Sequence, residues 1–330
     1  MSLAYRLMLA LLCAFLAVHF AGKKVIPWLH SLHFGQTIYD LGPKAHLNKQ
    51  GTPNMGGLLI GGITLLAAVV TLLIYWGKQG GSFIGMPLMF IVLLSAGAMA
   101  IGFADDYIKD VKKDHEGLKP RQKIIGQVIL GVVVSVMRYA VKGGGVRIPF
   151  TSAIWDMGLF YIPVMTVLVM FITNSSNLQD GVDGLLSTVT VMSMLGFAAI
   201  YLFKDTADAC LAPVAAALCG ACLGFLHFNR HPARIFMGDT GSMFIGGVMT
   251  ALAMWSGHEI FLIFLSFTCI ISSLSVMLQV TYFKLTHGKR IFKMSPLHHH
   301  FELCGFSENK IDLMYGAVSL LMALIAFLAA

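Results

Sequence analysis

Ten apolar runs divide this sequence from end to end, and each is long enough to cross the hydrocarbon core of a bilayer. A spanning helix needs about 20 predominantly apolar residues. No fixed-period repeat and no linker separates the runs, so residues 1–330 are expected to form a single ten-helix domain. The pattern predicts an all-α, polytopic integral membrane protein. The runs cover residues 2–22, 55–76, 83–104, 124–140, 158–176, 184–203, 209–228, 240–257, 260–283 and 311–330.

The composition excludes a water-soluble fold. Hydrophobic residues make up 57% of the chain and charged residues only 12%, which is about half the charged share of a typical soluble domain. So apolar a chain is not disordered either. The six cysteines are scattered, mostly inside apolar runs, so we expect reduced thiols and no disulfide framework.

Positively charged residues are shared unevenly between the loops, which predicts the orientation of the chain. Loops after the odd-numbered runs contain 17 Lys and Arg residues, whereas loops after the even-numbered runs contain four. Cytoplasmic loops collect Lys and Arg, so both termini are expected outside the cytoplasm. Lys23 and Lys24 follow the first apolar run instead of preceding it, which favours a retained helix over a signal peptide.

This topology signal explains most of the formal net charge of +7, and no nucleic-acid partner is expected. A cytoplasmic face rich in Lys, Arg and His would attract an anionic, phosphorylated substrate or acidic lipid head groups. The polar clusters gather in the cytoplasmic loops, whereas a secondary transporter would place coupling carboxylates near the membrane midplane. The pattern predicts a site that opens on the cytoplasmic face.

The first polar cluster is Asp105-Asp106-x-x-Lys109, at the inner end of the third run. On a helix Asp105 and Lys109 share one face, while Asp106 lies about 100° away. The cluster is either a helix-end ion pair or a pair of carboxylates suited to Mg²⁺ and phosphate chemistry.

The second cluster spaces Asn174, Asn177, Asp180 and Asp183 three residues apart. Steps of three rotate the side chain by about 60° each time, so these four cannot line one side of a straight helix. A helix that ends in a glycine-broken turn fits better. The cluster is either a polar cap or a set of groups that hydrogen-bond a uracil or a sugar.

The third cluster, residues 236–242, begins with Phe236 and contains Asp239, Thr240 and Ser242. Any of the last three could cap the helix that follows. The Asp-Thr-Gly triplet of aspartic proteases needs an all-β scaffold and a second copy, which this chain lacks. Phe236 also stands where the Gly-x-Gly-Asp motif of intramembrane aspartyl proteases begins with glycine, so neither protease class fits.

The fourth cluster is the triple histidine His298, His299 and His300, in the basic loop before the last run. Consecutive side chains diverge, so three neighbouring imidazoles do not close easily on one zinc ion. They either contact phosphate or other polar substrate groups, or belong to a structural loop. The loops at 49–57 and 117–123, taken alone, are turns flanked by positive charge.

Taken together, these clusters resemble the polyprenyl-phosphate N-acetylhexosamine-1-phosphate transferase superfamily. The stretches 295–302 and 51–57 are similar to its phospho-N-acetylmuramoyl-pentapeptide transferase branch, and the resemblance runs from about residue 33 to 310. Three positions depart from the pattern: Asn54 and Gln179 stand where Thr is expected, and Val182 where Leu is expected.

The resemblance implies that undecaprenyl phosphate attacks the sugar-linked phosphate of UDP-N-acetylmuramoyl-pentapeptide, releasing UMP and leaving the sugar-peptide on a lipid diphosphate. It further implies an Mg²⁺ cofactor, contact with membrane lipids, a homodimer, and a place in the bacterial cytoplasmic membrane. The implied chemistry agrees with the residues, because two anionic reactants need metal and basic groups to neutralise their charge.

By the same resemblance, Asp239 is an Mg²⁺ ligand, and Asp105 and Asp106 are catalytic carboxylates near the phosphates. Our own hypothesis is that Asp105 acts as a base or orienting group for the lipid phosphate and that Asp106 lies nearer the metal. Uridine is expected to contact Lys49, Asn177 and Asp183 and to stack on Phe236, and Lys123 is expected to contact phosphate. The full set of expected substrate contacts is Lys49, Asn54, Lys123, Asn174, Asn177, Asp180, Asp183, Asn229, Phe236, His298, His299 and His300.

Three alternatives stay open at this point. A sister transferase would use UDP-N-acetylglucosamine as the donor, and the triple histidine is the feature that argues against it. The transfer itself could be a direct attack by the lipid phosphate or could pass through a covalent phosphosugar on an aspartate. A ten-helix carrier or lipid flippase would transport its substrate without releasing UMP.

Overall fold

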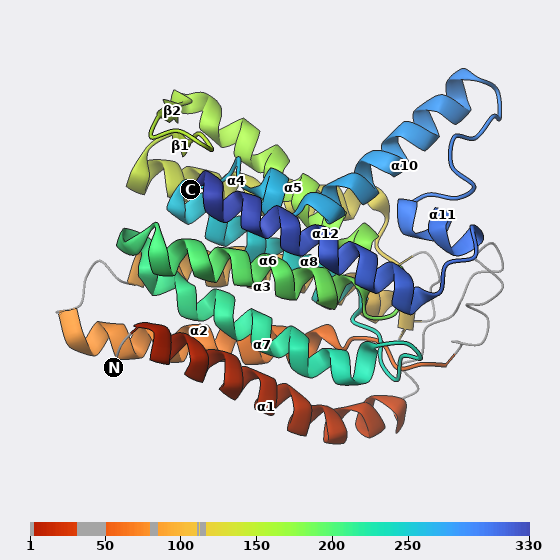
Figure 1. Ribbon diagram of the computed structural model, residues 1–330, viewed down its shortest axis with the longest axis horizontal. Coiled ribbons are helices and arrows are strands. Elements are labelled where there is room, and N and C mark those ends of the chain that lie inside the picture. Colours follow the sequence, from red (N-terminus) through yellow and green to blue (C-terminus); the bar gives the residue numbers. More distant parts are fainter. Residues whose placement is uncertain (1–2, 32–50, 80–84, 111, 113–116) are drawn as a thin grey trace.

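The computed structural model describes residues 3–31, 51–79, 85–110, 112 and 117–330. Within these residues the predicted apolar runs fall on long helices, except that the run 260–283 forms one short and one long helix. The all-α polytopic fold class is confirmed (Figure 1). The long helices are α1 Leu3–Ser31, α2 Gly57–Gln79, α3 Gly85–Asp110, α4 Pro120–Lys142, α5 Tyr161–Gln179, α6 Leu185–Phe203, α7 Ala212–Asn229, α8 Gly238–Ser256, α10 Phe267–Leu285 and α12 Glu308–Ala329. The short elements are β1 Gly145–Arg147, β2 Ile154–Asp156, the 3₁₀ helices Gly158–Phe160 and Thr206–Leu211, α9 Leu262–Leu265 and α11 Leu297–Leu303.

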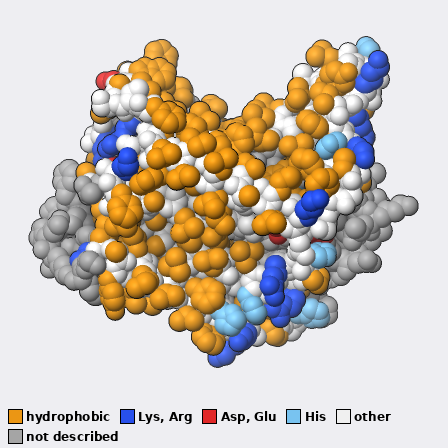
Figure 2. Space-filling model, viewed as in Figure 1, with side chains coloured by type: hydrophobic (Ala, Val, Ile, Leu, Met, Phe, Trp, Pro, Cys, Tyr) orange, Lys and Arg blue, Asp and Glu red, His pale blue; other side chains and the backbone are white. Residues whose placement is uncertain are grey.

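The chain is a multi-pass membrane protein. In the described part, eight helices are long and apolar enough to cross a membrane, and a ninth, α2, is apolar over Gly57–Thr71. Large hydrophobic side chains such as Phe20, Ile129 and Leu313 are exposed. Figure 2 shows that hydrophobic side chains cover most of one face of the molecule. Such a face is unfavourable in water but not in lipid, where the surrounding acyl chains are equally apolar.

Helix α8 forms the centre of the bundle. Every side chain from Thr240 to Ser256 is buried, because α2, α3, α5 and α6 pack around it. Glycines make these approaches possible: a Cβ on Gly57 would lie 2.1 Å from Gly241 N, and a Cβ on Gly102 would lie 2.2 Å from Asp239 O. The start of α8 is therefore pressed against the end of α3.

The predicted run at 260–283 is broken in the structure. It forms the single-turn helix α9 and the long helix α10, which meet at Ser266. The carbonyl of Leu265 accepts a hydrogen bond from Ser193 Oγ of α6. After the break α10 leans away from the rest of the bundle (Figure 1), and its exposed side chains include Leu274, Met277 and Leu278.

The six cysteines are free, as expected.

The two short strands form an antiparallel hairpin after α4, at the end of the bundle opposite α11 (Figure 1).

Candidate active site

The end of α3 carries two adjacent carboxylates that are almost fully buried. Asp105 and Asp106 are each 2% exposed, and Lys109, one turn later, contacts Asp105 as the sequence spacing predicts. Asp105 also accepts a hydrogen bond from the N–H of Leu118 at 2.7 Å. The loop folds over this carboxylate at Gly117, whose φ is +65° and whose Cβ, if present, would lie 2.7 Å from Asp105 Oδ1.

Asp106 faces the first turn of α8. It accepts hydrogen bonds from the N–H of Asp239 at 3.1 Å, the N–H of Thr240 at 2.8 Å and the hydroxyl of Thr240 at 2.6 Å. A helix leaves its first backbone donors free, and its dipole favours a carboxylate there. The N-cap residue, Met237, has no capping side chain, so Asp106 from another helix binds these donors and the Asp239 side chain is left for other contacts.

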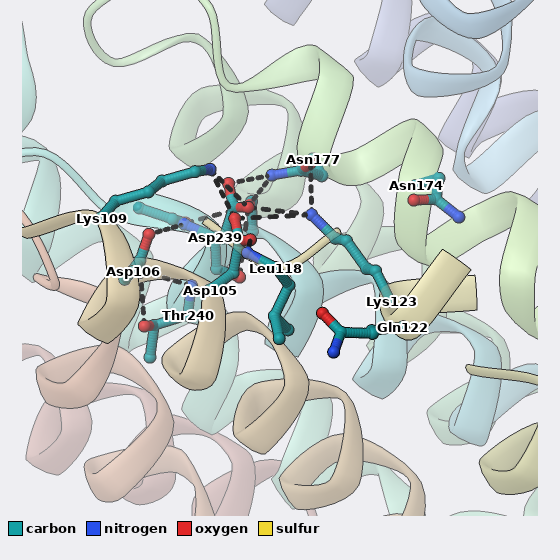
Figure 3. Close-up of polar contacts among 12 residues, drawn as sticks. Asp105, Asp106, Lys109, Leu118, Gln122, Lys123, Asn174, Asn177, Asp239 and Thr240 are labelled. Carbon is teal, nitrogen blue, oxygen red and sulfur yellow. Dashed lines mark hydrogen bonds and ion pairs between the residues drawn. The ribbon is translucent and has the colours of Figure 1, made fainter. Parts of the chain in front are cut away.

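Asp239 is the point at which four helices converge (Figure 3). Its Oδ2 accepts hydrogen bonds from Lys123 Nζ of α4 at 2.8 Å and from Lys109 Nζ of α3 at 3.4 Å. Its Oδ1 accepts a hydrogen bond from Asn177 Nδ2 of α5 at 2.7 Å. Asn177 Nδ2 also lies 2.9 Å from Ser242 Oγ. The structure thus brings together Asp105, Asp106, Lys123, Asn177 and Asp239, residues that the sequence places up to 134 positions apart.

The loop before α2 pairs with the segment before α8. Phe236 N–H donates to Pro53 O at 2.8 Å, and Gly56 N–H donates to Phe236 O at 2.9 Å. This pairing holds Phe236, which is partly exposed, and Asn54, which is 5% exposed, beside the carboxylates. Asn54 Nδ2 donates to Asp110 Oδ2 at 2.9 Å.

Asp180 is the residue directly after α5, in the glycine-broken turn that the sequence predicted. Burial, together with the negative charges of Asp239, Asp106 and Asp183, raises the pKa of Asp180 to about 8. Removal from water is the larger cause, and the neighbouring carboxylates add to it, so the turn after α5 disfavours the ionised form of Asp180.

Asn174 lies one turn before Asn177 and does not join this group. Its Nδ2 donates to Gln127 Oε1 at 2.9 Å and to Met170 O at 2.8 Å. In Figure 3 its side chain stands apart from the carboxylates. The three-residue spacing accounts for this, since only part of the Asn-Asn-Asp-Asp series can face one direction.

Asp183 and Asn229 belong to a neighbouring polar group. Asp183 Oδ2 accepts a hydrogen bond from Ala233 N–H at 3.0 Å and lies 3.1 Å from His231 Nδ1, which is also 3.1 Å from Glu308 Oε1. Ligand atoms of Asp183, His231 and Glu308 lie within 4.8 Å of one another, a spacing that could hold a metal ion. Asn229 ties the turn after α5 to the loop after α7, with Gly184 N–H donating to its Oδ1 at 3.2 Å.

Two of the three histidines face the turn after α5, and the third does not. A Cβ on Gly181 would lie 2.4 Å from His298 Nε2 and 3.0 Å from His299 Nε2. His298 is fully buried, and His299 Nδ1 contacts Glu302. His300 instead accepts a hydrogen bond from Lys293 N–H at 3.1 Å. The expected divergence of consecutive imidazoles is confirmed for His300 but was wrong for His298 and His299, whose ring centroids lie 4.4 Å apart.

Sequence reasoning missed His231, Glu308 and Thr240 as members of these groups. Neither His231 nor Glu308 belongs to a motif, so only the folded chain shows that they meet Asp183. Thr240 was visible as a capping candidate, but the capping carboxylate comes from α3. Lys49, expected to contact uridine, lies outside the described residues.

The arrangement is suited to reactions of phosphates. Three carboxylates and two lysines meet at the ends of α3, α4, α5 and α8. Lysine ammonium groups bind phosphate oxygens, and carboxylate oxygens bind the hard divalent cations that accompany diphosphates.

Known proteins are similar to this chain over almost its whole length. The model of a family described as glycosyl transferase family 4 matches residues 88–257, a stretch that contains all three carboxylates. A phospho-N-acetylmuramoyl-pentapeptide-transferase from Caldicellulosiruptor bescii is 42% identical over 318 residues, which cover 96% of this chain and 95% of the relative. Proteins with the same name from Heliobacterium modesticaldum and Bacillus subtilis are 44% and 40% identical, over 94% and 97% of this chain and 93% and 96% of the relatives. This chain therefore belongs to the phospho-N-acetylmuramoyl-pentapeptide-transferase family.

Proposed function

We propose that this enzyme transfers phospho-N-acetylmuramoyl-pentapeptide from its UDP-linked donor to undecaprenyl phosphate, releasing UMP and forming lipid I, the first membrane step of peptidoglycan synthesis. The names of its full-length relatives support this reaction. The observation that carries the proposal is the convergence of Asp105, Asp106 and Asp239 with Lys109 and Lys123 at one end of the bundle.

The two lysines suit a diphosphate donor. Lys123 Nζ lies between Asp239 Oδ2 at 2.8 Å and Asn177 Oδ1 at 3.4 Å, so its charge is held in place before any substrate binds. A fixed cation stabilises negative charge that develops on a leaving phosphate without having to reorganise. Lys109, which contacts Asp105 and Asp239, would act on the same charge from the opposite side.

Mg²⁺ is the cofactor that we propose for this site. Asp105 and Asp239 pair with Lys109 and Lys123, and Asp106, held by the first turn of α8, adds a third carboxylate. This set of oxygen ligands fits an added divalent cation. Asp239 and Asp106 would hold it. When bound, the ion would neutralise charge on the donor diphosphate.

Asp105 and Asp106 are proposed to have different roles, because different groups already donate hydrogen bonds to their oxygens. Both oxygens of Asp106 accept hydrogen bonds from the first turn of α8, which lowers their nucleophilicity and makes Asp106 a positioning group. The oxygens of Asp105 are also engaged, by Leu118 N–H and Lys109 Nζ, but the Lys109 ammonium can move to a bound phosphate, so Asp105 is the better candidate to orient the lipid phosphate or accept its proton. A covalent phosphosugar on Asp105 is the competing mechanism, and trapping of labelled sugar phosphate without lipid acceptor would support it.

The site is proposed to face the cytoplasm, with both termini outside. The helix ends that build it lead into loops rich in Lys and Arg, such as the one after α3, and cytoplasmic loops collect these residues. The homodimer that the resemblance implies is also a proposal, which light scattering of the purified protein would test.

Release of UMP by the purified protein, with undecaprenyl phosphate and Mg²⁺, tests the proposed reaction. UDP-N-acetylmuramoyl-pentapeptide and UDP-N-acetylglucosamine serve as parallel donors. Release with the muramoyl donor alone is the expected result. Release with the glucosamine donor alone would assign the chain to the sister reaction, and release from neither donor by folded protein would reject both.

A further inference from the structure

Basic side chains from α1 and from the end of α7 meet on the surface of the bundle. The ring centroids of His19 on α1 and His227 in the last turn of α7 lie 4.7 Å apart. Lys23 follows His19 by one helical turn, and Arg234 Nη2 donates a hydrogen bond to His227 O at 2.9 Å. The positive charges of Lys23, Arg230 and Arg234 also act on the His227 ring. These five residues are called the α1–α7 basic cluster.

Close packing of α1 on α7 holds the two imidazoles together. An ideal Cβ on Gly220 of α7 would lie 2.1 Å from Leu11 O, and one on Gly224 would lie 2.7 Å from Phe15 O. Two glycines one turn apart on α7 therefore let the backbone of α1 approach. The cluster is thus fixed by the packing of the two helices.

The α1–α7 basic cluster has no acidic partner in the part of the chain that the structure describes. All ion pairs there involve other basic groups. Lys23 Nζ lies 5.3 Å from the Phe20 ring centroid, and Arg234 Cζ lies 5.1 Å from that of Phe228. The end of the α7 dipole favours nearby cations, but His19 and Lys23 lie within α1, away from its end. Repulsion between these cations would be relieved by an anion that the described chain does not supply.

An exposed apolar stripe leads along α1 to the cluster. Leu12, Leu16 and Phe20 are exposed, and their spacing of four residues places them on one face of the helix. Lys23 follows on the next turn of that face. Figure 2 shows basic side chains at the lower edge of the apolar face of the molecule, where Figure 1 places α1 and α7. The surface thus joins a positively charged end to an apolar strip, which is the complement of an anionic amphiphile.

We propose that the α1–α7 basic cluster binds the head group of an anionic phospholipid of the surrounding bilayer, with an acyl chain along Leu12, Leu16 and Phe20. Lysine and arginine donate to phosphate oxygens, and basic pockets between transmembrane helices bind acidic head groups. A zwitterionic head group would bring a cation of its own to the cluster, so charge complementarity selects the anionic lipid. The inference goes beyond the proposed function, because none of the five basic residues belongs to the candidate active site.

Native mass spectrometry of the purified full-length chain, titrated in detergent with phosphatidylglycerol or with phosphatidylcholine, tests the proposal. Phosphatidylglycerol is expected to bind more tightly than phosphatidylcholine. Lys23→Gln/Arg234→Gln removes two charges of the cluster and is expected to weaken phosphatidylglycerol binding about tenfold. Lys284→Gln/Lys289→Gln is the matched control, because it removes two exposed lysines at and after the end of α10. Its affinity for phosphatidylglycerol should equal that of the wild type.

Unchanged phosphatidylglycerol affinity in Lys23→Gln/Arg234→Gln would overturn the proposal. Equal losses in the two double variants would also overturn it, because a diffuse attraction of anionic lipid by positive charge predicts that result. The same holds for equal binding of the two lipids by the wild type. Thermal unfolding without added lipid checks that each variant is folded. Should a double variant fail to fold, Arg234→Gln and Lys284→Gln give the same comparison with one charge removed.

Discussion

Two groups of charged side chains lie at opposite ends of α4, and their hydrogen bonds go to different kinds of partner. Lys123 near the start of α4 belongs to the candidate active site, and Arg138 and Lys142 near its end belong to the second group. Residues 123 and 142 are separated by about 28 Å along the helix.

At the far end the cations bind the backbone. Arg138 is 3% exposed and donates to Met254 O at 2.7 Å and Gly143 O at 2.8 Å. Lys142 donates to Trp255 O at 2.8 Å and to Asp208 at 3.1 Å. Helix ends leave carbonyls free and favour positive charge, so these side chains close the ends of α4 and α8.

At the candidate active site Asp239 and its lysines bind other side chains, while Asp105 and Asp106 also accept backbone N–H groups. Asp239, Lys123 and Asn177 come from three helices, and their contacts are side chain to side chain. Burial of charge is therefore common to both ends and does not identify function. The distinguishing features are the convergence of side chains from several helices and the excess of acidic groups.

The largest expected difference between the two ends of α4 is in the rate of UMP release after a glycine is replaced by alanine. Gly238 and Gly143 both have positive φ, +72° and +74°, but only Gly238 is crowded, with Asp106 and Asn54 within 2.6 Å of its Cβ position. We expect Gly238→Ala to lower UMP release about 100-fold, since it displaces the carboxylates. Gly143→Ala, with open space around it, should lose about 1 kcal/mol of stability and keep its rate within about twofold. Equal losses of rate would contradict the distinction.

A matched pair of lysines gives a smaller effect. Lys123→Gln removes the charge beside Asp239 and is expected to lower UMP release about 30-fold with little change in Tm. Lys142→Gln removes the bonds to Asp208 and Trp255 O, so it should lower Tm while the rate per folded molecule changes less than about twofold. Thermal unfolding and UMP release are measured on the same preparations. A rate that falls equally in both would place Lys142 in the catalytic machinery.

The smallest expected effect is a pH-dependent change in stability when Glu259 is replaced. Burial raises the pKa of Glu259 to about 7, while Tyr161 OH donates to its Oε1 at 2.6 Å. Because the pKa of Glu259 is raised from 4.5 to about 7 on folding, the wild type loses stability as the pH rises from about 4.5 to 7. Glu259→Gln should therefore be more stable than the wild type at pH 8, by on the order of 3 kcal/mol, with a higher Tm, and the difference should vanish below about pH 4. A difference in Tm that does not change with pH would reject this explanation.

Local sequence patterns predicted the features that depend only on nearby residues, namely the positions of the helices and the directions of side chains along them. Apolar run length located the helices, and helical spacing placed Lys109 beside Asp105 and turned Asp106 away. The adjacency of the histidines predicted that His300 turns away, but not that His298 and His299 both face Gly181. Each feature that was predicted is fixed within about one turn of helix, so no knowledge of the packing was needed.

Features that depend on distant packing were not predictable. The break at Ser266 involves Ser193 of α6, and the capping of α8 involves Asp106 of α3. Neither partner carries a local signal. The sequence also could not show that Asn174 faces Gln127 while Asn177 reaches Asp239.

The most direct test of the distinction between the two ends compares Asp239→Asn with Asp208→Asn. Both substitutions remove a carboxylate that pairs with a lysine of α4, Lys123 for Asp239 and Lys142 for Asp208. UMP release from the muramoyl donor is measured for both folded variants. We predict a loss of about 1000-fold for Asp239→Asn and less than about twofold for Asp208→Asn. Retained release by Asp239→Asn, or equal losses in both variants, would contradict the account.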